Sequence, residues 1–350
     1  MNDTRFVITR PLPASGLGAN LLSLVGGLYL AERTGRHLIV DWTEMEALRD
    51  KHTNYFVAFF EPIRRWGSVE IFYVGDDDPS RDVRYPADQA FQVGAQDMPA
   101  ALAGTLDHPY LYLDAYHYER VFNACTWLTP AARFHYTRTF YRALALRPAV
   151  RARLAAARTA FEASVVIGLN VRTGNKHPLW APGQIYEHRL RQDILERPDF
   201  VERAYRACLD CVGRLPREIW APVKIYVVSD SAVMQRRLLA IPGAFAVRRH
   251  HPPAGVSLNF NDFDERQYGA YSDIDSVTET LVDMFLLAEC QGLVCNYTEY
   301  NRYAQSVTTF FNGNLVNLEH AFEHPVRAIG RRARQWVRRR ALPTSAAGAR

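Results

Sequence analysis

Short apolar runs alternate along the chain with longer segments of helical periodicity. An apolar run at 6–8 is followed by a helical segment at 17–33 and by a second apolar run at 37–42. Strands joined by a helix pair in parallel, because the crossover needs a dozen or more residues. The first forty residues therefore predict a β-α-β unit. The apolar stretch 21–30 within the helix is too short to span a bilayer and is expected to belong to an amphipathic helix.

Further segments of both kinds follow along the chain. Strands and helices in alternation are typical of an α/β protein with parallel sheets, and 350 residues suffice for two domains. A segment rich in Ala, Arg and Leu, at 129–160, is expected to be a helix that bridges the two halves. We predict domains at 1–158 and 159–326 and a basic tail at 327–350. The further predicted strands lie at 110–114, 165–171, 223–228 and 292–295, and the further helices at 200–212 and 277–288.

Polar residues follow three of these strands. Arg172 ends the first run, Asp230 and Ser231 follow the next strand, and a polar run that includes Thr298 follows the last. In open α/β sheets, ligands bind beyond the carboxyl ends of the strands. The guanidinium of Arg172 suits the diphosphate of a nucleotide sugar, although a surface ion pair would also explain it. Ser231 can equally be a plain helix cap.

Three segments carry a resemblance to a known family, namely Arg172–Asn175, Ser229–Ala232 and Leu281–Ala288. They resemble the three donor-site motifs of the α-1,6-fucosyltransferase family, and above all those of its rhizobial members. The resemblance extends over nearly the whole chain, and it implies an α/β fold of two Rossmann-like domains in a GT-B-like arrangement. It also implies an inverting enzyme that uses GDP-fucose and needs no metal or other cofactor, with the acceptor on the amino-terminal domain and the donor on the other. Weaker motifs lie at 5–10, 16–18, 31–36, 40–42 and 59–62.

The resemblance assigns roles to single residues. Arg172 matches the arginine that grips the β-phosphate, and Asn175 and Lys176 follow it as further contacts. Asp283 matches an acid within the third motif, although it could instead cap or pair inside its own helix. The donor-binding residues implied in this way are Arg172, Asn175, Lys176, Asp230, Ser231, Asp283 and Thr298.

The general base is where this chain departs from the family. Animal members carry a glutamate where this chain has Trp180, and a rhizobial member carries one at the position of His177. A histidine of ordinary pKa, about 6.5, can accept the proton of an acceptor hydroxyl, although His177–Pro178 could also be only a loop turn. Glu187 is the next candidate. Two alternatives therefore remain. The protein could transfer another GDP-sugar or form another linkage, or it could bind a nucleotide sugar without catalysis.

The cysteines and the acidic residues bear on whether the chain binds a metal. Cys208 and Cys211 have the spacing of a metal or redox pair, but no second pair matches it among the five cysteines. Buried free thiols are therefore expected, and no metal site. The acidic run 76–78 is expected to be a solvated charge run.

The end of the chain is strongly basic, with six arginines at 331–340 around Trp336, and it accounts for most of the net charge of +5. As a helix this tail could lie on an anionic membrane, and otherwise it would be solvated. Motifs for nucleic-acid recognition are missing, so no nucleic acid is expected as a partner. With neither a secretory signal nor a long apolar run, we expect a cytoplasmic protein, with peripheral contact to the inner membrane through the tail. The expected acceptor is an oligosaccharide or a lipid-linked saccharide.

Overall fold

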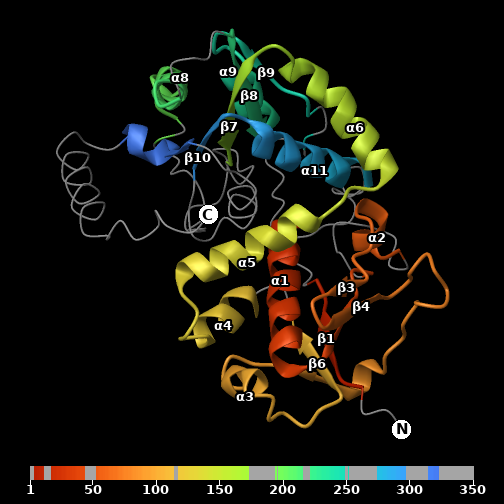
Figure 1. Ribbon diagram of the computed structural model, residues 1–350. Helices are drawn as coiled ribbons and strands as arrows, with labels where there is room; N and C mark the ends of the chain where they lie inside the picture. Colours follow the sequence, from red (N-terminus) through yellow and green to blue (C-terminus); the bar gives the residue numbers. More distant parts are fainter. Residues whose placement is uncertain are drawn as a thin grey trace, which may run out of the picture.

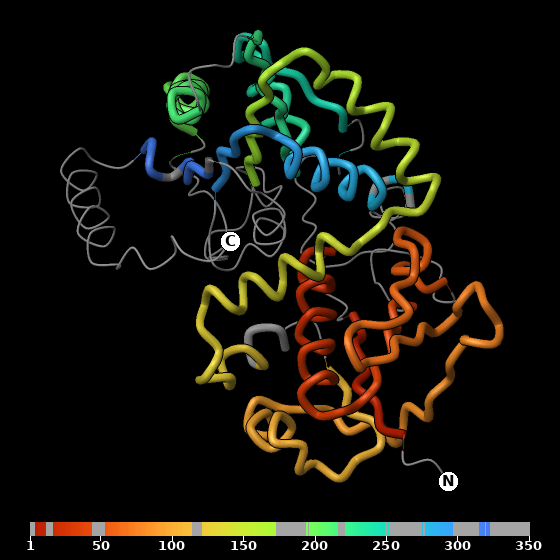
Figure 2. Tube along the Cα trace, in the orientation of Figure 1, coloured from red at the N-terminus to blue at the C-terminus, as the bar shows by residue number. Residues whose placement is uncertain are grey.

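The computed structural model has two lobes, each built around its own mainly parallel β-sheet (Figure 1). The chain completes the first lobe, crosses along α5 and α6, and then builds the second (Figure 2). The structure describes residues 4–11, 17–43, 53–113, 117–172, 194, 196–215, 221–248, 251, 274–296 and 314–322.

The sheet of the first lobe has the strand order β3-β4-β2-β1-β6-β5, and only the β3–β4 pair is antiparallel. The predicted parallel β1–β2 pair is confirmed, with Phe6 opposite His37. Because β1 lies between β2 and β6, Val7 and Ile8 are completely buried. The strands are β1 (Phe6–Thr9), β2 (His37–Val40), β3 (Arg65–Trp66), β4 (Val69–Tyr73), β5 (Ala90–Gln92) and β6 (Tyr110–Leu113).

Helix α1 is the centre of the first lobe. It spans Leu17–Thr34, as the periodicity predicted, but every residue from Leu17 to Ala31 is buried. The prediction of an amphipathic helix is wrong, because α1 packs between the sheet and helices α3, α4 and α5. At Gly27 a Cβ atom would lie 2.2 Å from Cγ2 of Thr9, so only glycine allows this close approach to β1. The other helices are α2 (Tyr55–Phe59), α3 (Met98–Leu102), α4 (His117–Ala124) and α5 (Pro130–Ala143), with a 3₁₀ turn η1 (Ala87–Gln89).

The crossing between the lobes is made of two helices, α5 and α6 (Pro148–Arg158), so the single helix predicted over 129–160 is wrong. Leu144 is extended at the end of α5, and Arg147 has ψ of 153°. The ring of Pro148 disfavours the helical conformation in the residue before it, while Pro148 itself is well suited to open α6.

Arg147 ties this crossing to the first lobe. Its backbone N–H donates to Phe59 O at 2.9 Å, and its Nε donates to Val57 O at 2.8 Å. Its guanidinium also pairs with Glu61, at 3.3 Å, and with Asp77. The bend before α6 is therefore held by backbone and charge contacts together.

Helix α6 packs instead on the second lobe. Arg153 pairs with Asp275, and Arg158 pairs through two nitrogens with Glu289, both acids of α11 (Ile274–Glu289). The chain therefore passes from contacts with the first lobe to contacts with the second lobe between Arg147 and α6. The predicted domain division at residue 158 stays a prediction.

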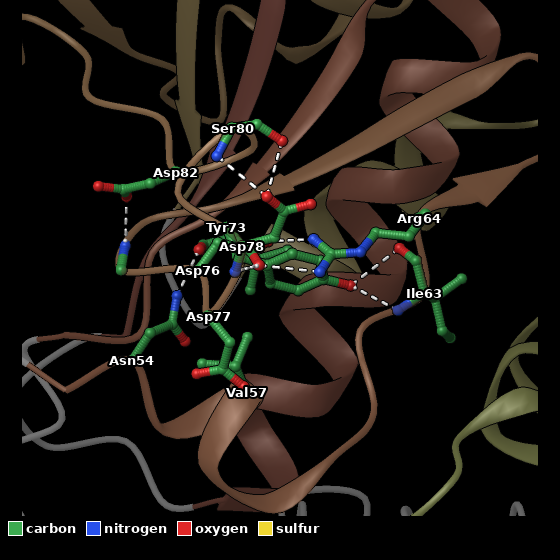
Figure 3. Close-up of polar contacts among 12 residues, drawn as sticks. Asn54, Val57, Ile63, Arg64, Tyr73, Asp76, Asp77, Asp78, Ser80 and Asp82 are labelled. Atoms are coloured by element: carbon green, nitrogen blue, oxygen red, sulfur yellow. Dashed lines mark hydrogen bonds and ion pairs between the residues drawn. The ribbon is translucent and has the colours of Figure 1, made fainter.

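The acidic run Asp76–Asp78 takes part in ion pairs and hydrogen bonds within the first lobe (Figure 3). The Asp76 carboxylate is completely buried against Arg64, whose Nη2 donates to Oδ1 at 2.8 Å. Burial raises the pKa of Asp76, but hydrogen bonds from Arg64 and from the Asp78 amide hold it below its ordinary value. The interpretation as a solvated charge run is therefore wrong for Asp76, because its counter-ion lies on the neighbouring strand segment.

The sheet of the second lobe has the order β11-β10-β7-β8-β9 and is entirely parallel. Its predicted strands and helices are present. The side chains of α8 pack on one face of the sheet and those of α11 on the other. The elements are β7 (Val165–Val171), β8 (Val223–Ser229), β9 (Ala244–Phe245), β10 (Gly292–Cys295), β11 (Asn314–Asn317), α8 (Phe200–Val212), α9 (Ala232–Leu238), η2 (Thr159–Phe161) and η4 (Leu318–Phe322).

All five cysteines are buried free thiols, as predicted. Cys208 and Cys211 lie on the inner face of α8, where burial raises the pKa of each thiol. Within the described ranges, the structure contains no helix with the length and apolar character that a membrane crossing requires.

Candidate functional site

Three polar residues follow neighbouring strands at the carboxyl edge of the second sheet. Arg172 follows β7, Asp230 follows β8 and Asn296 follows β10. Val171 lies opposite Ser229 in the β7–β8 register, so Arg172 and Asp230 leave the sheet side by side. This is the edge at which α/β sheets bind their ligands.

Asn296 holds the backbone of Arg172. Its Oδ1 accepts the Arg172 N–H at 2.9 Å, and its Nδ2 donates to Arg172 O at 2.9 Å. The side-chain amide thus pairs with Arg172 as a further strand residue would, and it is 1% exposed. Sequence analysis did not single out Asn296. The available signal was an amide residue directly after a buried strand that neighbours β7.

Ser231 is the N-cap of α9. Its Oγ accepts a hydrogen bond from the Met234 amide at 3.4 Å, and its own N–H donates to Oγ of Ser229 at 3.2 Å. The plain-cap interpretation therefore accounts for the Ser231 hydroxyl. A contact between Ser231 and a ligand stays a prediction.

Asp283 lies deeper than the other candidates. It projects from α11 and accepts a hydrogen bond from the hydroxyl of Tyr226, three residues before the end of β8, while Arg248 lies 3.8 Å away. Burial raises the pKa of Asp283 to about 6, although Arg248 and Tyr226 oppose the shift. Tyr226 and Arg248 both lie outside α11, so the alternative that Asp283 caps or pairs inside its own helix is wrong.

His251 is a further polar residue near this edge that sequence analysis did not select. Its Nε2 lies 3.0 Å from Oε1 of Gln235 on α9, whose Nε2 donates to Arg248 O at 3.1 Å. Burial and the charge of Arg248 lower the pKa of His251, opposed by the Ser229 backbone and the Asp230 carboxylate. His251 therefore stands beside the end of β8. No local sequence pattern distinguishes His251, because its contacts are with residues that only the tertiary structure brings close to it.

The remaining predicted site residues lie outside the described part of the chain. Among the described residues, no cluster of three or more His, Cys, Asp or Glu side chains could hold a metal ion. The described edge offers a fixed arginine beside an aspartate, which suits an anionic ligand that also carries hydrogen-bond donors. The predicted residues beyond the description are Asn175, Lys176, His177, Glu187 and Thr298.

Comparison with known sequences identifies relatives. Residues 3–88 match the family model described as nodulation protein Z (NodZ). Nodulation protein Z of Bradyrhizobium diazoefficiens is 27% identical over 332 residues, covering 84% of this chain and 76% of that protein. The protein of the same name from Azorhizobium caulinodans is 25% identical, covering 83% and 85%. The resemblance found in the sequence is confirmed.

Comparison with solved structures gives the same result for the fold. The crystal structure of NodZ α-1,6-fucosyltransferase soaked with GDP-fucose superposes with a TM-score of 0.58 at 20% identity, covering 88% of this chain and 93% of that one. POFUT1 in complex with GDP superposes with a TM-score of 0.50 at 11% identity, covering 91% and 100%. The chain therefore has the predicted α/β fold, the GT-B arrangement of these fucosyltransferases.

Proposed function

From the similarity to nodulation protein Z over more than four fifths of the chain, we propose that this protein is an inverting glycosyltransferase that transfers fucose from GDP-fucose to a saccharide acceptor. One structural observation carries the proposal. Arg172 stands at the carboxyl edge of the second sheet with its backbone fixed by Asn296 and with Asp230 beside it. The lobe predicted at 159–326 would bind the donor, and that at 1–158 the acceptor.

The chemistry follows from the leaving group. When the bond from fucose to GDP breaks, negative charge grows on the diphosphate, and a preoriented cation stabilises it. Arg172 supplies that charge on a backbone that does not have to reorganise. Asn175, Lys176 and Thr298 would add donors, and Asp230 would accept hydrogen bonds from the nucleoside, while the buried Asp283 would support this edge through Tyr226 and Arg248. His177, or failing it Glu187, would take the proton of the acceptor hydroxyl.

The proposed function is tested by measuring GDP release from a panel of GDP-sugars, with and without chitin oligosaccharides. We expect release from GDP-fucose that rises with the oligosaccharide and yields a fucosylated product. Release from a different GDP-sugar would support the alternative donor. Tight GDP-fucose binding with no product from any acceptor would support a binding protein without catalysis.

Transfer should not depend on a divalent metal. We expect the initial rate in excess EDTA to stay within about twofold of the untreated rate, because Arg172 and Lys176 supply the positive charge that a metal would otherwise bring. The measurement is the rate before EDTA, with EDTA, and after manganese is added back. A loss that manganese restores would contradict the proposed mechanism.

The Asn296 clamp gives a second prediction. Asn296→Ala should lower kcat/KM for GDP-fucose by about tenfold or more, because it leaves a partly buried N–H and C=O of Arg172 without their Asn296 partner, at up to about 1 to 3 kcal/mol each. Thr129→Ala is the matched control, since it removes the N-cap of α5, whose hydroxyl accepts from the Ala132 amide, in the first lobe without touching Arg172. A similar loss of thermal stability in both variants, with kcat/KM reduced only in Asn296→Ala, is the expected result. Equal kcat/KM in the two would contradict the positioning role.

The tail supports a proposal about location. We propose that 331–340 contacts the anionic face of the inner membrane from the cytoplasm, where lipid-linked saccharides are assembled. Its support is the sequence, which places six arginines around Trp336. The vesicle experiment described below separates its contribution from that of the folded lobes.

A further inference from the structure

We propose that the first lobe carries its own docking surface for an anionic lipid membrane, distinct from the basic tail and from the donor site. The surface, which we call the aromatic-arginine face, lies at the end of α1, in the turn before α5 and along the outer side of α5. It consists of two groups, Arg33 with Trp127 and Phe134 with Arg138 and Arg142. The proposal goes beyond the proposed function and does not depend on it.

Trp127 is a fixed and exposed aromatic anchor. It is 55% exposed, the largest exposure among the large hydrophobic residues described. Its side chain is hydrogen-bonded to Tyr29, and the guanidinium carbon of Arg33 lies 5.5 Å from its ring centroid. Its polar N–H is thus satisfied inside the lobe, which leaves apolar ring surface beside a cation facing outward. Such a side chain suits the boundary between lipid headgroups and acyl chains.

Helix α5 continues this chemistry. Phe134, Arg138 and Arg142 are spaced four residues apart and therefore form one stripe along the helix. Phe134 is 45% exposed, and Arg138 covers its ring at 6.0 Å from the centroid. Within the described residues, neither arginine forms an ion pair. Arg142 is exposed, whereas Arg138 is partly buried and its buried Nε has no hydrogen-bond partner. By contrast, the exposed Arg206 on α8 pairs with Glu202.

The stretch of sequence that contains α5 is strongly basic. From Val121 to Phe161 the sequence contains seven arginines and no aspartate or glutamate. The acid next to Arg33 is Glu32, which accepts a hydrogen bond from the Tyr136 hydroxyl at 3.0 Å and so is turned toward α5. Helix α5 therefore presents cations and an apolar ring without a carboxylate of its own, and Glu32 is the acidic residue beside Arg33 on α1.

An anionic membrane fits this face better than other occupants. A second copy bound symmetrically through it would bring its arginines against their own equivalents, which is unfavourable. A soluble polyanion would use the charges but gain little from two exposed rings. Anionic headgroups neutralise the arginines while the rings of Trp127 and Phe134 enter the boundary, so both features contribute at once.

The test measures binding of the full chain to vesicles of phosphatidylglycerol and phosphatidylcholine. Phe134→Ala with Arg138→Gln should lower the partition coefficient by about tenfold, since a basic residue near such a surface contributes about fivefold. The matched control on α8, Leu209→Ala with Arg206→Gln, removes one exposed apolar side chain and one charge from the other lobe and should change it less than twofold. Phe134, Arg206 and Leu209 are exposed and Arg138 is partly buried, so the melting temperature of both double variants is measured to confirm that they fold.

The same pairs are then compared in a background in which the six tail arginines are replaced by glutamine. Residual binding should again fall with the α5 pair and not with the α8 pair. If only the tail replacement matters, or if both pairs act equally, the face is not a docking surface. Binding to duplex DNA with the same sensitivity, and none to vesicles, would also overturn the proposal.

Fluorescence gives a readout that charge alone would not move. In a Trp336→Phe background, anionic vesicles should shift the emission to shorter wavelength, and adding Trp127→Phe should abolish the shift while binding persists. A shift that survives Trp127→Phe would exclude Trp127 from the contact and contradict the proposal.

Discussion

Replacing Arg172 with alanine should abolish fucosyl transfer and weaken GDP binding while leaving the fold intact. The lost interaction is a charge-assisted, two-pronged contact to the diphosphate, worth about 2 to 4 kcal/mol in binding. The loss in kcat should be about 100-fold to 1000-fold, because the charge on the leaving group is largest in the transition state. The fold should survive, since the two hydrogen bonds to Asn296 involve only the Arg172 backbone. Calorimetry with GDP and the initial rate measure the two effects.

Arg172→Lys is the informative companion variant. It keeps the charge but loses the planar fork, so GDP affinity should be partly retained while the rate stays well below that of the unmodified protein. Arg206→Ala is the control for net charge, because it removes an exposed arginine of α8 that is not among the predicted site residues. Unchanged GDP affinity in Arg172→Ala would remove the donor site from this edge.

His177→Ala should lower the rate by about 100-fold if His177 is the general base. The rate of the unmodified protein should then fall as the pH drops below the histidine pKa, about 6.5 when unperturbed, because the charged imidazole cannot accept a proton. His177→Asn should keep the shape of the side chain without restoring the rate. GDP affinity should stay unchanged, which separates this loss from that of Arg172→Ala. A rate that is insensitive to both replacements would exclude His177.

Glu187→Gln is the competing variant. If Glu187 is the base, its replacement should carry the loss, and the acidic limb of the profile should move toward the ordinary carboxylate pKa of about 4.3. If neither variant changes the rate while GDP-fucose is still bound, the base belongs to the first lobe or to the acceptor. The chemistry would then lie away from the segment after β7.

Local sequence signals were sufficient for most of the framework. Strand and helix differ in the period of their apolar positions, so α1, β7, β8 and α8 could be predicted within a few residues of their bounds. The same reasoning failed where a local signal was overlooked, at Pro148, which divides the crossing into α5 and α6. It also failed for α1 as an amphipathic helix, since neighbours on every side bury it.

The sequence by itself determined that Arg172 and Asp230 would lie at one edge of a parallel sheet, because parallel strands end at a common edge and both residues directly follow strands. Only the tertiary structure decided what fixes them. Asn296 is 124 residues from Arg172, Asp283 is 57 residues from Tyr226, and the buried pair Arg64–Asp76 joins two separate segments. Such contacts depend on which helices and strands become neighbours in the fold. Packing between segments that are distant in the sequence decides this, and no local pattern of apolar and polar residues predicts it.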